Sequence, residues 1–119
     1  MTTYHAPVED IQFVFRELVG LNEIVGLTSF KEINTELIYN ILVEAEKLAS
    51  EVLEPLRKTG DYEGCQLKNG EVSTPKGYSE AYSQFIKGGW NSISSSPKYG
   101  GMGLPLLVTG ASFEIWHGA

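Results

Sequence analysis

The chain has 119 residues and a formal net charge of −6, and 42% of its residues are hydrophobic. That length allows one small domain built around a single core. Its nine Lys and Arg residues are scattered. This argues against a nucleic-acid-binding surface, because phosphates are neutralised by clustered basic side chains.

The single cysteine excludes an intrachain disulfide. The first residues lack the basic flank and apolar run of a signal peptide, and no apolar stretch is long enough to cross a bilayer. We therefore expect a soluble, cytoplasmic protein.

The first predicted helix begins near Pro7 and ends at Gly20. Its apolar residues recur at helical spacing and predict one apolar stripe, made of Ile11, Val14, Phe15, Leu18 and Val19. Residues 21–27 are expected to form a short turn.

The longest predicted helix begins after a cap at Asn34 or Thr35, and Pro55 ends or kinks it. Gly60 is expected to close this region. The predicted buried stripe comprises Leu37, Ile38, Ile41, Leu42, Ala45, Leu48, Ala49, Val52, Leu53 and Leu56.

A small hairpin is predicted near residues 65–74, because Asn69-Gly70 suits a tight turn with positive φ. A two-stranded ribbon is marginal by itself, so we expect it to pack against the helices. The overall fold is predicted to be all-α with this one hairpin.

Helical spacing returns over residues 76–87, with an apolar side formed by Tyr78, Ala81, Tyr82, Phe85 and Ile86. Gly88 and Gly89 are expected to supply left-handed conformations after it. A loop over residues 91–103 follows, and Pro105 begins a last helix. That helix runs to the chain end with apolar residues on more than one side, which predicts a domain that is incomplete at its C-terminus.

The glycine-rich stretch at residues 100–103 has two interpretations. A phosphate cradle would require a preceding strand with Rossmann spacing or a Gly-Lys-Ser/Thr ending, and neither is present. A tight structural turn between helices is therefore favoured, because glycine permits backbone angles that other residues avoid.

Isolated polar residues give no strong sign of catalysis. His5 and His117 lack metal-ligand spacing, and the pair His117 and Glu114 is read as a helix-surface pair. Cys65 is interpreted as an inert thiol. The four glutamates at positions 44, 46, 51 and 54 are interpreted as a solvated face rather than a paired-carboxylate site, and Trp90 and Trp116 as core or interface anchors.

Three stretches resemble the acyl-CoA dehydrogenases. Residues 46–56 (Glu-Lys-Leu-Ala-Ser-Glu-Val-Leu-Glu-Pro-Leu) are similar to the family's early helix with a late proline. Gly88-Gly89-Trp90 followed by Pro97-Lys98-Tyr99-Gly100-Gly101-Met102-Gly103 resembles the family's Pro-x-x-Tyr/Phe-Gly-Gly-x-Gly loop. Residues 4–13, 60–65 and 70–78 resemble the long bacterial subgroup that includes 3-methylmercaptopropionyl-CoA dehydrogenase-like enzymes.

The resemblance implies an FAD-dependent oxidoreductase of fatty acid β-oxidation that converts acyl-CoA to trans-2-enoyl-CoA. It also implies electron transfer to an electron-transfer flavoprotein and a homo-oligomer. The family's catalytic base is a glutamate beyond position 119, and the flavin is bound mainly outside this segment. No catalytic, cofactor-binding or metal-binding residue is therefore assigned here. The resemblance places Leu106, Leu107, Gly110 and Phe113 near the acyl pocket.

The predicted domain organisation is an N-terminal extension over residues 1–34 and an incomplete N-terminal helical domain over residues 35–119. We expect the chain to be inactive alone, with its role being to pack on the flavin-binding domains and wall the acyl pocket. The main alternative is a free-standing helical protein-interaction module. A complete small enzyme is disfavoured, because no nucleophile, metal set or cofactor loop is recognised.

Overall fold

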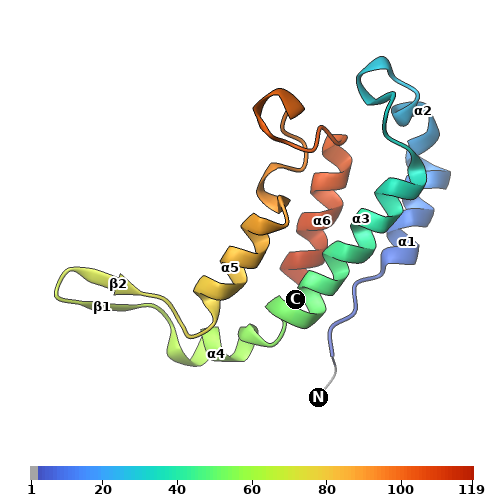
Figure 1. Ribbon diagram of the computed structural model, residues 1–119. Helices are drawn as coiled ribbons and strands as arrows, with labels where there is room; N and C mark the ends of the chain where they lie inside the picture. Colours follow the sequence, from blue (N-terminus) through green and yellow to red (C-terminus); the bar gives the residue numbers. More distant parts are fainter. Residues whose placement is uncertain (1–2) are drawn as a thin grey trace.

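The computed structural model describes residues 3–119, which form a flat array of helices with one projecting hairpin (Figure 1). Its principal extents are 53 × 37 × 17 Å. The predicted all-α class with one small hairpin is confirmed.

The first helical segment begins after Pro7, as predicted. Helix α1 (Val8–Phe13) continues as a π-helical segment, Val14–Val19, and ends at Gly20, whose φ is 75°. Within the predicted apolar stripe Ile11 and Phe15 are buried, whereas Val14, Leu18 and Val19 are exposed. The wider π-helical turn rotates the later residues off the face that Ile11 defines.

A short helix, α2 (Leu21–Val25), and a 3-10 turn, Thr28–Phe30, lead to the longest helix. Helix α3 (Thr35–Lys47) is capped by Asn34, whose Oδ1 accepts a 2.8 Å hydrogen bond from the Leu37 amide. A π-helical segment, Leu48–Leu53, continues it up to Pro55. The predicted cap and the break at the proline are both confirmed.

Gly60 does not close this region. It lies inside helix α4 (Leu56–Glu63), which starts directly after Pro55. A Cβ built on Gly60 would lie 1.9 Å from the Tyr78 hydroxyl, so the missing side chain makes room for that ring. The prediction of a stop at Gly60 was therefore wrong, because the glycine serves a close contact rather than a helix end.

The predicted hairpin is present, with β1 (Gln66–Lys68) antiparallel to β2 (Glu71–Ser73) and Leu67 opposite Val72. Asn69 and Gly70 both have positive φ, as a tight turn requires. The expectation that the ribbon packs on the helices is wrong, since every strand residue is exposed and the ribbon extends away from the bundle (Figure 1).

Helix α5 (Tyr78–Lys87) follows, and of the two glycines after it only Gly89 is left-handed. On its predicted apolar side Ala81 is buried, whereas Tyr78, Tyr82 and Ile86 are exposed. Two 3-10 turns, Trp90–Ser92 and Pro97–Tyr99, lie in the next loop. Helix α6 (Leu106–Gly118) begins after Pro105, as predicted.

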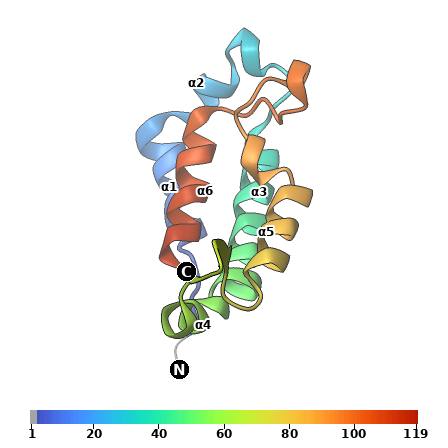
Figure 2. The same cartoon turned by 90° about the vertical axis from the view of Figure 1, so that its left-hand side faces the viewer.

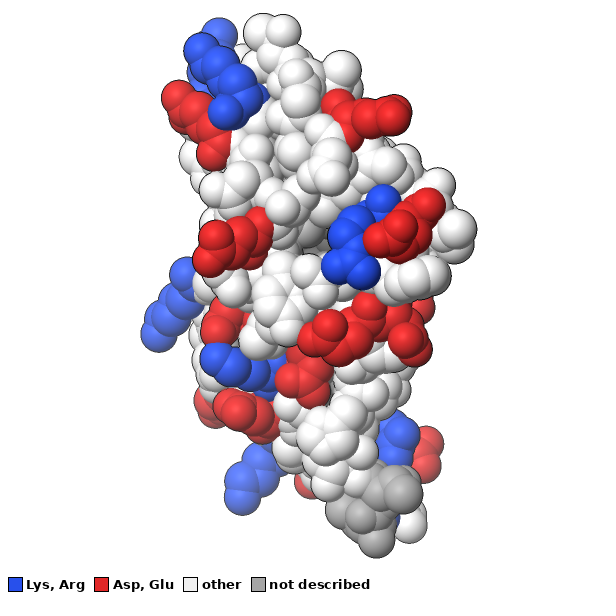
Figure 3. Space-filling model, turned by 90° about the vertical axis from the view of Figure 1, so that its right-hand side faces the viewer, with Lys and Arg blue, Asp and Glu red and all other residues white. Residues whose placement is uncertain are grey.

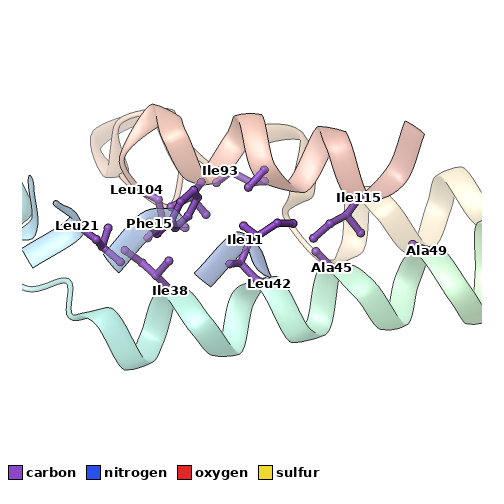
Figure 4. Close-up of a cluster of buried hydrophobic side chains, with 12 residues drawn as sticks. Ile11, Phe15, Leu21, Ile38, Leu42, Ala45, Ala49, Ile93, Leu104 and Ile115 are labelled. Atoms are coloured by element: carbon purple, nitrogen blue, oxygen red, sulfur yellow. The ribbon is translucent and has the colours of Figure 1, made fainter. Parts of the chain in front are cut away.

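The core lies between α3 and α6, which Figure 4 shows facing each other across the buried side chains. Ile38, Leu42 and Ala45 on α3 meet Val108 and Ile115 on α6. Of the other residues in the predicted stripe, Leu37 is exposed. Figure 2 shows that α1 lies beside α6, while α5 lies on the side of α3.

Residues 3–34 share this core. Ile11, Phe15 and Leu21 belong to the same buried cluster as Ile38 and Leu42. The proposed boundary between residues 34 and 35 therefore does not coincide with a gap in packing, and it stays a prediction about domain assignment.

Candidate functional site

The start of α6 is fixed by a loop that is closed by its own backbone. The amides of Gly101, Met102 and Gly103 donate to the carbonyls of Ser96, Ser92 and Ser95 at 3.1, 3.1 and 2.9 Å. Leu104 then donates to Ile93 at 3.0 Å, which ties the loop end to a buried residue. The loop thereby sets where α6 begins and how it lies on α3.

Each glycine in this loop has a backbone reason. Gly100 and Gly103 have φ of 84° and 67°, which side chains rarely adopt. A Cβ on Gly101 would lie 2.1 Å from the Ser95 carbonyl oxygen. These constraints support the structural interpretation of the stretch over a phosphate cradle, because the amides that would hold a phosphate already bond to carbonyls.

The four predicted pocket residues all lie on α6 but do not share one cavity. Leu107 and Gly110 line a groove of about 340 Å³ between α1 and α6, whereas Phe113 lines a larger groove on the other side. Leu106 is 75% exposed and is not part of either lining. The helix therefore presents these residues to two separate surfaces.

The groove between α1 and α6 has an apolar floor and an acidic rim. Ile11, Phe15 and Ala111 form part of its floor, and Asp10 and Glu114 stand among its lining residues. Gly110 leaves open space, because no atom lies within 4 Å of a Cβ built there.

The larger groove, of about 600 Å³, lies between α4, α5, α6 and the π-helical segment before Pro55. Its lining is mainly apolar and aromatic, and comprises Leu53, Leu56, Arg57, Tyr78, Ala81, Tyr82, Phe85, Phe113, Trp116, His117 and Ala119. We call it the α5–α6 groove. Its size and lining are typical of small-molecule sites.

Trp116 anchors the floor of the α5–α6 groove. Its indole Nε1 donates a 3.1 Å hydrogen bond to the Ala45 carbonyl, and its ring meets Phe85 edge-on with centroids 5.0 Å apart. Trp90 and Phe113 contact the same ring at 5.4 and 5.6 Å. The interpretation of both tryptophans as packing anchors is confirmed.

His5 and His117 contact different residues. His5 is 3.4 Å from a Glu46 carboxylate oxygen. His117 Nδ1 lies 2.7 Å from the Phe113 carbonyl, so this nitrogen carries the proton and Nε2 is left available. Within residues 3–119 no cluster of three His, Cys, Asp or Glu side chains is placed to hold a metal ion.

The remaining polar residues between positions 3 and 119 give no catalytic pair. Cys65 is exposed and free, and Glu44 pairs with Lys47 on the solvent side of α3. The pKa of Tyr39 is raised mainly by its hydrogen bond to Glu9, and burial, with Glu114 and Glu46, raises the pKa of Tyr4. The Thr109 and Ser112 hydroxyls are buried without a partner in the described chain, but neither lines a groove described above.

Sequence reasoning missed the α5–α6 groove as a site. The helical spacing of Tyr78, Tyr82 and Phe85 predicts one apolar side of a helix. Residues with the same spacing can instead line a groove. The polar hydroxyl groups of the tyrosines were the one sequence feature that favoured this second interpretation.

The charged surface agrees with the composition. Figure 3 shows acidic and basic side chains interspersed on the face drawn, with no broad basic patch. In the part of the chain that the structure describes, no helix is long and apolar enough to cross a membrane.

Two curated proteins are similar to the chain. The 3-methylmercaptopropionyl-CoA dehydrogenase of Ruegeria pomeroyi is 40% identical over 117 residues, which cover 98% of this chain and 20% of that protein. The broad-specificity linear acyl-CoA dehydrogenase FadE5 of Mycobacterium tuberculosis is 24% identical over 121 residues, which cover all of this chain and 20% of that protein. The chain thus spans about a fifth of the length of these relatives. No family model matches it.

Proposed function

We propose, because this chain belongs to the acyl-CoA dehydrogenase family, that it acts as the N-terminal helical part of an enzyme that oxidises acyl-CoA to trans-2-enoyl-CoA. The observation that carries this proposal is the 40% identity along 98% of the chain to one such dehydrogenase. The rest of the enzyme supplies the remaining four fifths of the length found in the relatives.

The surface of the chain supports a packing role. The accessible surface is 8045 Å², whereas a folded monomer of this 13.1 kDa mass is expected to expose ~6,400 Å². The radius of gyration is 16.6 Å, against ~13.5 Å for a compact domain of this length. The exposed hairpin contributes to this excess. Such a shape suits a layer that is covered by further protein.

Within this proposal α6 forms part of the wall of the acyl pocket. Leu106, Leu107, Gly110 and Phe113 lie along α6 on surfaces that are open in this chain. Their apolar character suits contact with a hydrocarbon chain or with the domains that enclose it. The closed glycine loop sets the position of that wall.

FAD is the cofactor we propose for the whole enzyme, with an electron-transfer flavoprotein as acceptor. The described residues do not fit a flavin site of their own, because the glycine-loop amides are already bonded to carbonyls. We propose that the flavin site and the catalytic base belong to other parts of the enzyme, as the family resemblance implies. We place the enzyme in the bacterial cytoplasm as a homo-oligomer.

The test compares two purified polypeptides, residues 1–119 alone and the product of the complete gene. Each is incubated with FAD, freed of unbound flavin, and scanned for the flavin band at about 450 nm. We expect the complete product to retain flavin that bleaches on addition of an acyl-CoA, and residues 1–119 to remain colourless.

Two outcomes would contradict the proposal. Flavin retained and bleached by residues 1–119 alone would show that the chain is itself the catalyst. A complete gene product that binds no flavin and oxidises no acyl-CoA would favour the alternative, a helical interaction module without catalysis.

A further inference from the structure

The α5–α6 groove combines an apolar floor with a cation at its edge. Trp116, Phe85 and Phe113 meet at ring centroid distances of 5.0 and 5.6 Å from the tryptophan, so the floor is a continuous aromatic surface. Leu53 and Leu56 extend this surface on the side of α4. A ligand lying here would exchange water for apolar contacts over most of its length.

The charge of the lining differs in sign from that of the whole chain. The whole chain carries a net charge of −6, yet no Asp or Glu side chain lines the α5–α6 groove. Arg57 does line it, and within residues 3–119 its guanidinium forms no ion pair. A permanent, unpaired cation beside an apolar surface is complementary to an anion that carries an apolar tail.

The groove is also held in shape by contacts that need no ligand. Trp116 is fixed by its hydrogen bond to the Ala45 carbonyl, and Tyr78 packs where Gly60 leaves room for its hydroxyl. His117 is held by its Nδ1 contact with the Phe113 carbonyl, which leaves Nε2 as a further polar group at the lining. A preformed wall reduces the entropy lost when a ligand binds.

We propose that the α5–α6 groove is a binding site for a free aliphatic carboxylate, with the hydrocarbon tail on the Trp116 floor and the carboxylate paired with Arg57. The ligand class is the free acid rather than a thioester. The lining residues that carry this proposal lie between Leu53 and Ala119, and the proposal does not depend on the dehydrogenase activity proposed above. The occupancy of the groove would then depend on the concentration of free fatty acid.

The experiment titrates octanoate into the polypeptide as its gene encodes it and follows binding by isothermal calorimetry. Tryptophan fluorescence gives a second readout, because Trp116 lies in the floor. We expect saturable binding that weakens as salt is added, since an exposed ion pair is screened. In Arg57→Met the dissociation constant should rise by about tenfold, as expected for loss of a charge-assisted contact.

Matched variants separate this site from a general effect of charge. Lys31→Met removes one cation outside the groove and should leave the affinity unchanged, while Arg57→Lys should retain part of it. Tyr82→Ala shortens a wall residue that is 66% exposed, so it should weaken binding without unfolding the chain. Circular dichroism of each variant checks the fold.

The control ligand is 1-octanol, which has the same tail but no charge. Weaker octanol binding that is unaffected by Arg57→Met would support the proposal. The proposal would be overturned if octanol and octanoate bound with equal affinity, or if Arg57→Met left the affinity for octanoate unchanged. Either result would favour a groove that binds by apolar contact alone. Absence of octanoate binding would overturn it as well, in favour of a groove covered by other protein.

Discussion

In the loop before α6, glycines occupy positions where a side chain would strain the backbone or collide with it. Gly101 is the tightest case, because a Cβ would contact backbone atoms of Ser95 at 2.1 and 2.4 Å. Backbone held by three loop hydrogen bonds cannot move aside easily. The close approach, rather than the φ angle, explains this glycine.

Gly101→Ala is expected to destabilise the chain by about 1–3 kcal/mol, the usual range for forcing extra volume into a packed site. Urea unfolding followed by the fluorescence of Trp90 and Trp116 measures the change. Gly110→Ala is the matched control, since its Cβ meets nothing within 4 Å. Alanine in that helix should stabilise by up to ~1 kcal/mol. Equal effects of the two substitutions would refute the close-approach argument.

At the scale of elements, the segment before α1 is tied to α6 at its far end. The Tyr4 hydroxyl donates a 2.8 Å hydrogen bond to the Ile115 carbonyl, and it packs where Gly118 has no side chain. Burial is the main cause that raises the pKa of Tyr4, with Glu114 and Glu46 adding to it. The neutral phenol is therefore the form that the fold prefers.

Tyr4→Phe should lower the free energy of unfolding at neutral pH by about 1 kcal/mol, the typical net value of one hydrogen bond. Because the folded pKa lies above 10.0, this contribution is fully present below pH 10 and is lost as pH rises through the folded pKa. The difference between wild type and Tyr4→Phe, from urea unfolding at pH 7 and at alkaline pH, should therefore shrink at alkaline pH. Tyr39→Phe is the comparison, since within residues 3–119 that exposed hydroxyl donates to Glu9 alone. A difference that grows with pH would contradict the sign.

The helices and the hairpin could be predicted because their signals are local. Asn34 caps through its own side chain, Asn69-Gly70 supplies positive φ, and Pro55 interrupts a helix wherever it falls. Gly60 was misjudged because its role depends on Tyr78, which is distant in sequence. A glycine that ends a helix and a glycine that admits a neighbouring ring have the same local appearance.

The site could be predicted less well, since helical spacing defines a face but not what covers it. Leu18 and Tyr82 have the spacing of core residues yet are 73% and 66% exposed. The assignment of Leu106, Leu107, Gly110 and Phe113 came from the family resemblance, and it remains a prediction. The α5–α6 groove depends on how α4, α5, α6 and the π-helical segment before Pro55 meet, which periodicity within one helix does not encode.

At the scale of the whole molecule, the decisive feature is the apolar surface left open on a thin array of helices. Phe13, Val14, Leu18 and Val19 form an exposed apolar side on the first helical segment. The accessible area exceeds the ~6,400 Å² expected for a compact monomer of this mass by more than the ~800 Å² that one partner buries in a typical interface. Such a surface favours association when residues 1–119 are isolated.

We therefore expect residues 1–119, purified alone, to associate as their concentration is raised, and Leu18→Glu to reduce that association. The added carboxylate would have to be desolvated in any contact formed through this side. Sedimentation velocity over a concentration series measures the change. Ser83→Glu, which places the same charge on an exposed polar position of α5, should have little effect. A chain that stays monomeric at all concentrations would contradict this prediction, because the open apolar side would then be stable in water without a partner.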